Sequence, residues 1–268
     1  MVKLSEIYAV ADGISPKRLS DEYCEKYGAY DNSGVLVDCG EDIQSVVFSL
    51  DLSFAAIEKA ISTNANLIIT HHPAIYGKIG DICVDSPLGN KLIRCIKNGV
   101  SIIAMHLNLD GAQGGVDESL RDGICIATNT KTVENQRIMH PLSTGGYGRV
   151  YTVQPCGLKT FQENVSKEFS TDKTIFYGDC DKRISRVASF CGAGVDEEAI
   201  AFAKRQNADV IVSSDFKHHL IGLALESGLA VVVLPHYASE NYGFKKYYEK
   251  IRRQLDIPCV YHTDGELL

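Results

Sequence analysis

The sequence predicts an α/β fold made of two pseudo-repeated β-α-β-α-β units with mainly parallel strands. Two observations lead to this prediction. Short apolar runs rich in β-branched residues alternate with helical patterns, which is the order found in parallel α/β proteins. The same order of elements then occurs a second time within the 268 residues, which indicates that the chain contains two copies of one unit.

The first copy begins after a short helix and a turn-rich stretch. Ser53 is expected to cap one of its helices. Gly99 is expected to end another, because a helix C-terminus favours glycine in the left-handed conformation. The expected elements are a helix from Leu4 to about Ala11, strands at 35–37, 45–50, 67–70 and 100–105, and helices from the Ser53 cap to about Thr63 and at 87–98.

The second copy repeats this order. Residues 64–70 correspond to 207–213, and Asn98-Gly99 corresponds to Ser227-Gly228. The expected elements are strands at 187–190, 209–212 and 229–234, a helix capped by Asp196 that reaches Gln206, and a helix that ends near Ser227. The predicted division is a first half (1–123), a connecting segment with a strand and a helix (124–182) and a second half (183–268).

Composition and charge exclude several classes of protein. The net charge is −7, and lysine and arginine do not gather in a basic stripe, which argues against nucleic-acid binding. No apolar run approaches the roughly 20 residues that span a bilayer, and the N-terminus lacks the apolar core of a signal peptide. The nine cysteines contain no CxxC pair, so we expect a reduced, cytoplasmic protein without membrane segments.

Histidine is concentrated where strands are expected to end. Ligands of α/β proteins bind at the carboxyl ends of the strands, so histidines at these positions are candidate functional residues. An acid stands four residues after each of two of them, Asp110 after His106 and Glu240 after His236. Six of the eight histidines lie at strand ends: His71, His72, His106, His218, His219 and His236.

Imidazole and carboxylate side chains together suit divalent ions such as Zn, Fe(II) or Mn. Matched sets in two halves predict two ions in one shared site, with Asp110 and Glu240 as bridging or terminal carboxylates. The alternative for any single histidine is a hydrogen-bonded structural residue. The alternatives for Asp215 and Lys217 are a charge at a helix N-terminus and a solvated lysine.

The His71-His72-Pro73 segment predicts how the two ions are divided. Pro73 has a fixed φ and favours an extended conformation for His72. Side chains of adjacent residues point to opposite sides of an extended chain. We therefore expect His71 and His72 to bind two different ions.

Seven segments carry a family resemblance: 30–34 (YDNSG), 70–73 (THHP), 106–110 (HLNLD), 114–117 (GGVD), 148–150 (GRV), 215–219 (DFKHH) and 236–240 (HYASE). In this order, and over essentially the whole chain, they resemble the Nif-three-like family of hexameric proteins with a dinuclear metal centre. Many members are named GTP cyclohydrolase 1 type 2 homologues. The sequence departs from the family pattern at Tyr30, Leu107, Ser214, Val233 and Pro235. Val233 replaces an acid, which leaves open what orients His236.

The resemblance implies a Nif-three-like fold, a homohexamer and two divalent ions (Zn, Fe or Mn) per subunit. Glu240 is implied to bridge the ions. The implied metal ligands are His71, His72, Asp110, His236 and Glu240. Residues implied to lie close by are His106, Asp215, Lys217 and His218.

Two functions agree with these residues. The first is a metal-dependent hydrolase of a small nucleotide-like or phosphorylated molecule, in which His106 or His218 transfers protons and Lys217 attracts an anion. A GTP cyclohydrolase type of reaction is implied by the resemblance alone, because the sequence shows no Gly-rich loop that cradles phosphates. The second is a non-enzymatic metal-binding protein or regulatory hexameric scaffold.

Overall fold

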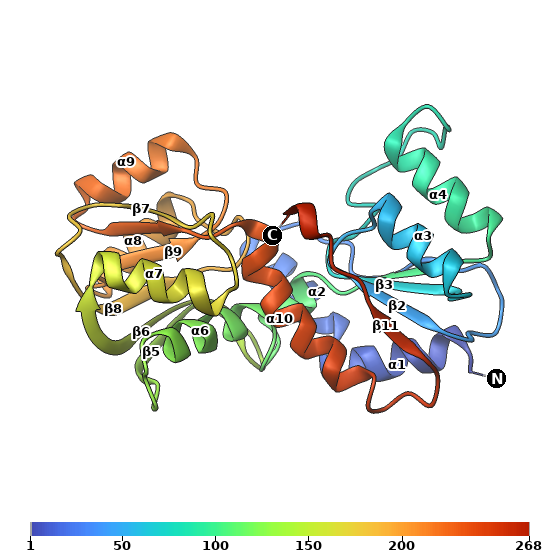
Figure 1. Cartoon of the computed structure of the whole chain (residues 1–268), viewed down its shortest axis with the longest axis horizontal. Helices are drawn as coiled ribbons and strands as arrows, with labels where there is room; N and C mark the ends of the chain where they lie inside the picture. The colour runs from blue at the N-terminus through green and yellow to red at the C-terminus, as the bar shows by residue number, and fades with distance from the viewer. Residues whose placement is uncertain (1, 268) are drawn as a thin grey trace. The chain divides into compact units, whose positions relative to one another are not determined.

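The computed structural model describes residues 2–267, which form two compact units (Figure 1). The first unit combines the chain up to Ala112 with Phe244–Glu266. The second unit contains Gln113–Gly243 and Leu267, so the boundary falls within one helix, α10 (His236–Ile251). The halves predicted above are defined by sequence correspondence rather than by compactness, and they stay a prediction.

The first unit is built on a five-stranded sheet in the order β1-β4-β3-β2-β11. The three predicted strands β2 (Val46–Ser49), β3 (Leu67–Thr70) and β4 (Ser101–Ala104) pair in parallel, which confirms the predicted repeat order. The C-terminal strand β11 (Cys259–Tyr261) joins β2 in parallel. β1 (Gly34–Val37) runs antiparallel to β4 at the other edge.

Helices cover both faces of this sheet. Figure 1 shows α3 (Phe54–Ser62) and α4 (Pro87–Lys97) on one face, with α1 (Leu4–Ile14) and the end of α10 on the other. The predicted caps are present, since Ser53 Oγ accepts a hydrogen bond from the Ala56 N–H and Gly99 has a φ of +66°. The core beneath α3 and α4 consists mainly of the buried side chains Val47, Ile57, Ile68, Leu92, Cys95 and Ile102.

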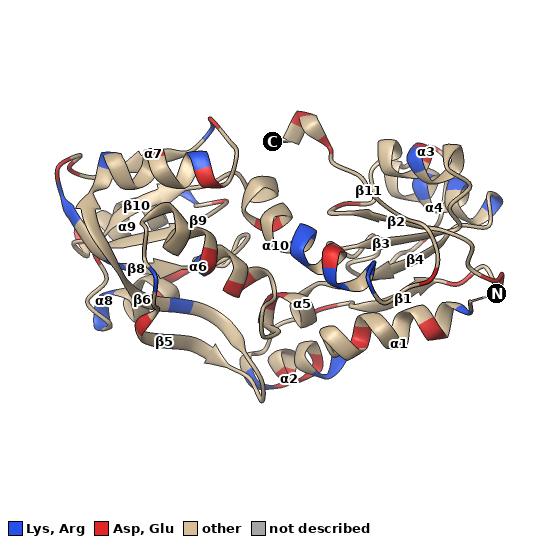
Figure 2. Cartoon of the chain, turned by 60° about the horizontal axis from the view of Figure 1, so that its bottom comes forward, with Lys and Arg blue, Asp and Glu red and all other residues tan. Residues whose placement is uncertain are grey.

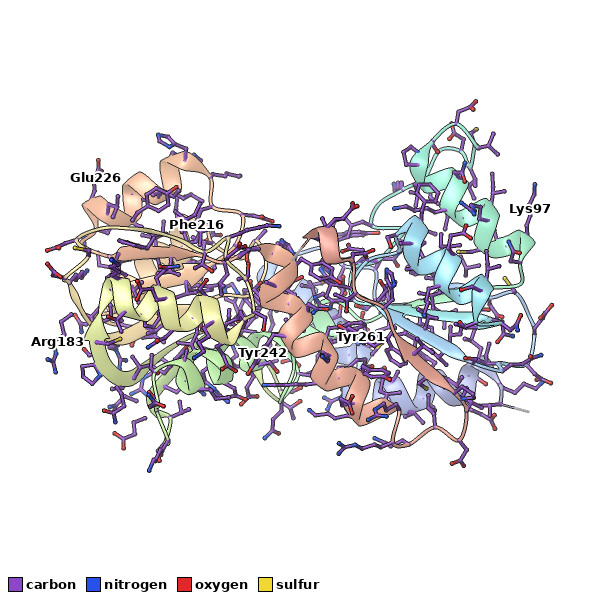
Figure 3. The ribbon with its side chains drawn as sticks, viewed as in Figure 1. Lys97, Arg183, Phe216, Glu226, Tyr242 and Tyr261 are labelled. Atoms are coloured by element: carbon purple, nitrogen blue, oxygen red, sulfur yellow. The ribbon has the colours of Figure 1, made fainter. Side chains whose placement is uncertain are left out.

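Aromatic side chains fill the opposite face of the sheet. Phe48 of β2 packs against Phe244, with ring centroids 6.4 Å apart. Tyr261 of β11, labelled in Figure 3, packs against Tyr248 at 5.1 Å. The buried Tyr247 hydroxyl donates a hydrogen bond to the Ala11 carbonyl, which ties the end of α10 to α1 within the first unit.

The second unit contains a six-stranded sheet in the order β5-β6-β8-β9-β10-β7. β8 (Arg183–Ser189), β9 (Val210–Ser213) and β10 (Ala230–Val233) are parallel, as predicted for the repeat. The segment 124–182 extends this sheet with antiparallel strands on both sides. These strands are β5 (Glu134–Pro141), β6 (Gly146–Gly157) and β7 (Ile175–Tyr177).

The helices of the second unit pack in pairs. α6 (Val116–Ala127) lies beside α7 (Leu158–Glu168), and α8 (Glu197–Arg205) lies beside α9 (His218–Glu226). Asp196 caps α8 as predicted, because its carboxylate accepts a hydrogen bond from the Ala199 N–H at 2.8 Å. Tyr242, labelled in Figure 3, packs against Phe169 with its ring tilted, and its hydroxyl donates a hydrogen bond to Glu168 at 2.7 Å.

Several elements were not predicted. α2 (Lys17–Tyr27) is mostly charged and polar and buries only Leu19 and Ser20, so its apolar periodicity is weak. α5 (Leu107–Gly111) is a single turn, and a 3₁₀ turn at Gly265–Leu267 follows β11. α6 and α10 were also missed.

The surface charge is mixed. Figure 2 shows acidic and basic residues interspersed along the ribbon, with no basic stripe along any one helix in this view. Among residues 2–267, no helix combines the length and the apolar character that a membrane crossing requires.

Two segments of the family pattern meet in a buried ion pair. Arg149 Nε lies 2.9 Å from Asp117 Oδ2, and both side chains are almost completely buried. The backbone N–H groups of Gly148 and Cys191 also donate hydrogen bonds to Asp117. Burial raises the pKa of Asp117 to about 6, against the opposing effect of Arg149, so the carboxylate is mainly ionised at neutral pH. These segments are therefore joined inside the second unit by an ion pair whose charges depend on each other, because neither side chain can reach solvent.

We predict that Arg149→Met lowers the free energy of unfolding by about 3–5 kcal/mol, because the Asp117 charge stays buried without its partner. Urea denaturation at pH 7.5 measures this change. The matched control is Arg252→Met, which removes an exposed pair with Glu249 and should cost less than about 1 kcal/mol. Equal losses in the two variants would contradict the proposed role of the buried pair.

Candidate metal centre

The chain bends where β3 ends. The N–H groups of His71 and His72 both donate hydrogen bonds to the Leu50 carbonyl, at 3.1 and 3.0 Å. Successive N–H groups of an extended strand point in opposite directions. Two consecutive donors on one acceptor therefore show that the backbone leaves the extended conformation at His71.

This bend overturns one prediction. The rings of His71 and His72 do not point to opposite sides, and their centroids lie only 5.0 Å apart. The prediction was wrong because it assumed an extended chain up to Pro73. The binding of a separate ion by each histidine loses this support and stays a prediction.

A third imidazole joins the pair in the first unit. The His106 ring lies 5.3 Å from the His71 ring and 5.8 Å from the His72 ring, between centroids. One ring nitrogen of each of the three residues lies within 4.8 Å of one from each of the others. The carboxyl ends of β3 and β4 thus bring His106 beside the His71-His72 pair, from which it is distant in the sequence.

Four histidines share one hydrogen-bonding arrangement, in which Nδ1 contacts an oxygen that can only accept. Nδ1 therefore carries a proton, and the lone pair of the neutral ring lies on Nε2. Metal-binding histidines in proteins are commonly held in this way. The pairs are His71 with the Met105 carbonyl (2.7 Å), His72 with Asp51 (2.7 Å), His106 with Asp31 (2.7 Å) and His236 with Asp215 (2.6 Å).

His106 and Asp31 shift each other's pKa values. Burial alone would raise the pKa of Asp31, but the hydrogen bond and charge of His106, with hydrogen bonds from Ser20 and Ser33, lower it to about 2. Burial opposes protonation of His106, but Asp31 and Asp110 outweigh this effect and raise the His106 pKa above its usual value. Asp110 is itself buried, and its Oδ1 lies 3.4 Å from Nε2 of His71.

The second unit contains a matching pair. His236 is the first residue of α10, and Glu240 lies one turn later on the same face, which places its Oε2 2.9 Å from His236 Nε2. Glu240 is buried, while the His236 side chain is 30% exposed. Asp215 orients His236 by accepting a hydrogen bond from its Nδ1. The family usually has an acid at the position of Val233, and Asp215 shows which acceptor His236 has in this chain.

The remaining candidates lie at the start of α9. Lys217 is the N-cap residue of this helix, and His218 and His219 follow it. All three side chains are exposed. Figure 3 shows Phe216, the residue before Lys217, in the segment that leads to α9. The catalytic assignments of Lys217 and His218 stay predictions.

Comparison with known proteins identifies the family. The sequence model of the Duf34/NIF3 (NGG1p interacting factor 3) family matches residues 2–263. The chain belongs to the Duf34/NIF3 family. This result confirms the resemblance to the Nif-three-like family that the seven segments indicated.

Individual relatives agree with the Duf34/NIF3 assignment. A Clostridium perfringens protein named GTP cyclohydrolase 1 type 2 homolog is 30% identical, covering 99% of this chain and 97% of its own length. The structure of reduced HcgD from Methanocaldococcus jannaschii is 27% identical, with a TM-score of 0.78 and 97% of each chain covered. A Bacillus cereus protein related to NIF3 has a TM-score of 0.80 at 20% identity, covering 97% of this chain and 96% of that one. The predicted fold class is therefore confirmed.

Sequence reasoning also missed a glycine beside the candidate site in this Duf34/NIF3 chain. Gly192 follows β8 with a φ of +56°, and a methyl group there would collide with Oε1 of Glu240 and lie 3.4 Å from Cε1 of His236. Gly194 packs similarly against the Tyr147 hydroxyl, which donates a hydrogen bond to the Cys191 carbonyl. The sequence signal that could have found Gly192 was the pair of glycines, Gly192 and Gly194, directly after a strand.

We predict that the Asp31–His106 pair stabilises the metal-free protein most between about pH 4 and about pH 6.5. The pKa of Asp31 is lowered from about 3.9, the value in the unfolded chain, to about 2 in the folded protein. Asp31 therefore stabilises the fold at pH values above about 3.9, and this stabilisation is lost as the pH falls towards 2. The pKa of His106 is raised above about 6.5, the value in the unfolded chain. His106 therefore stabilises the fold at pH values below about 6.5, and this stabilisation is lost at higher pH. Asp31→Asn should therefore cost on the order of 2 kcal/mol at pH 5.5 and less at pH 9.

Urea denaturation of wild type and Asp31→Asn at both pH values measures this difference. Asp172→Asn, which changes an exposed carboxylate, is the control and should show no such pH dependence. A cost of Asp31→Asn that grows from pH 5.5 to pH 9 would contradict the ion pair.

We predict that Gly192→Ala destabilises the metal-free protein through Glu240. Gly228→Ala is the control, because Gly228 also has a positive φ, of +86°, but open space around it. Left-handed backbone strain alone costs about 1–2 kcal/mol, so Gly192→Ala should cost more than Gly228→Ala in urea denaturation. The excess should vanish in a Glu240→Ala background, and an unchanged excess there would exclude the Glu240 contact as its cause.

Proposed function

We propose that this protein is a metal-dependent hydrolase that uses two divalent ions. The observation that carries the proposal is the shared arrangement of the histidines, each held at Nδ1 by an acceptor. This arrangement fixes the ring direction and places the lone pair on Nε2. The proposed ligands are His71, His72, Asp110, His236 and Glu240, with Glu240 bridging the ions.

The side chains fit such ions chemically. All five proposed ligands are imidazoles or carboxylates, which suit Zn, Fe(II) or Mn, whereas a soft-metal site would use thiolates. Asp110 and Glu240 are buried. A buried carboxylate is costly unless a cation or hydrogen-bond donors compensate its charge, so bound ions would stabilise both.

The proposed mechanism uses the chain as a rigid frame. A divalent ion would supply Lewis acidity and lower the pKa of the water that it binds towards neutrality. Asp51 and Asp215 orient His72 and His236 through their Nδ1 atoms. His106 is suited to hold a proton at Nε2, because Asp31 and Asp110 favour its charged form. His218 is the second candidate for proton transfer.

The substrate that we propose is a small nucleotide-like or phosphorylated molecule. The exposed Lys217 offers a cation to an anionic group at the start of α9. The relatives named GTP cyclohydrolase 1 type 2 homolog support a nucleotide among the first compounds to assay. The homohexamer implied by the resemblance belongs to this proposal, and native mass spectrometry measures it.

A non-enzymatic metal-binding or regulatory scaffold is the second candidate. The partial exposure of the His72 and His236 side chains, 26% and 30%, favours it. Partly exposed ligands allow ions to exchange with solution, which metal storage or delivery requires. Rapid exchange of bound ions without any substrate-dependent turnover would support this function.

We predict metal-dependent hydrolysis by purified protein loaded with Mn, Fe(II) or Zn and assayed against a panel of nucleotides and phosphorylated metabolites. Glu240→Ala should lower the rate by about 100-fold or more and lower the number of bound ions. Glu226→Ala is the control, since Glu226 lies at the exposed end of α9 (Figure 3). Absence of turnover across the panel, with ions bound, would favour the scaffold instead.

A further inference from the structure

His106 and His236 occupy equivalent positions in the two units. His106 is the N-cap residue of α5 after β4, and His236 is the first residue of α10 after β10. A carboxylate holds each Nδ1, at 2.7 Å in one case and 2.6 Å in the other. An acid stands four residues later in both helices. His106 therefore shares with His236 the position after a strand, the carboxylate at Nδ1 and the acid four residues later.

The neighbours of His106 include two further imidazoles. His71 and His72 each lie within 6 Å of it between ring centroids, and all three offer ring nitrogens within 4.8 Å of one another. Each of the three has its Nδ1 held by an acceptor. All three rings therefore present the same nitrogen, Nε2, as the ligand atom.

We propose that His106 is a metal ligand and that His71, His72 and His106 bind one divalent ion using residues of the first unit alone. This inference rests on the proposed function, because it concerns the same metal chemistry. It goes beyond that function because it predicts that the first unit binds one ion even when His236 and Glu240 have been replaced. Asp110 is the fourth candidate ligand, since its Oδ1 lies 3.4 Å from Nε2 of His71.

The geometry requires only small adjustments. Two nitrogens bound to one tetrahedral zinc ion lie roughly 3.3 Å apart, from bond lengths of about 2.0–2.1 Å. The His71 ring is fully buried, whereas the His72 and His106 side chains are 26% and 18% exposed. Binding one ion would require small shifts of the two partly exposed side chains towards His71, with their Nδ1 hydrogen bonds retained. Three imidazoles with a carboxylate or water suit zinc and similar ions of intermediate softness.

Metal binding and proton transfer by His106 exclude each other at any moment, because both use Nε2. A chain that carries a single ion would have His106 bound to it. Proton transfer by His106 would then require that the ion be held by other ligands.

The experiment counts ions in a chain that lacks the ligands of the second unit. The His236→Ala/Glu240→Ala double variant is equilibrated with Zn²⁺ or Co²⁺, and bound metal is measured by mass spectrometry. We expect one ion per chain, with three imidazole ligands by X-ray absorption spectroscopy. Adding His106→Asn, whose amide can still donate to Asp31, should weaken binding at least tenfold and change the visible absorption of Co²⁺. Adding His140→Ala, which alters a histidine of β5 outside the candidate site, should change neither.

The outcomes separate this inference from the proposed function. Loss of all metal from the double variant, while wild type binds two ions, would overturn the inference and leave the proposed function intact. Retention of the ion after His106→Asn, with unchanged affinity and spectrum, would also overturn it. A wild-type protein that binds no ion would overturn both. If His106→Asn prevents folding, His106→Gln in the same background provides the same readout.

Discussion

The hydrogen bond at Nδ1 of His71, His72, His106 and His236 is the interaction on which the candidate site depends. It selects the tautomer, fixes the ring direction and leaves Nε2 as the ligand atom. The acceptors near His71 and His72 come from neighbouring parallel strands, since the Met105 carbonyl follows β4 and Asp51 follows β2. The carboxyl ends of the parallel strands therefore hold both candidate ligands and the groups that orient them.

The repeat also explains residues outside the candidate metal centre. At the opposite ends of the strands, Asn66 accepts a hydrogen bond from the Gln44 N–H, and Asp209 accepts one from the Ser185 N–H. These corresponding residues connect the start of a strand with the strand beside it. Similarity between the two copies thus has two sources. Residues at the amino ends of the strands connect neighbouring strands, and residues at the carboxyl ends orient the histidines.

The sequence predicted the repeated strands well, because continuous β-branched runs and helix caps such as Ser53 and Asp196 are local signals. It could not give the side on which the His71 and His72 rings lie, because that depends on a contact with Leu50 about twenty residues away. The family resemblance indicated Asp215, but its bond to His236 required the fold. Asp31 and Asp51 were missed as acceptors for the same reason, since nothing local connects them to His106 and His72.

The central claim is that the histidines present Nε2 to divalent ions. Anomalous diffraction from crystals of the metal-loaded wild-type protein, recorded at the absorption edge of the bound metal, tests it most directly. The account predicts peaks at about 2.0–2.2 Å from Nε2 of His71, His72 and His236, with their Nδ1 hydrogen bonds retained. Peaks bonded to Nδ1, or bound metal with no peak at these histidines, would contradict it.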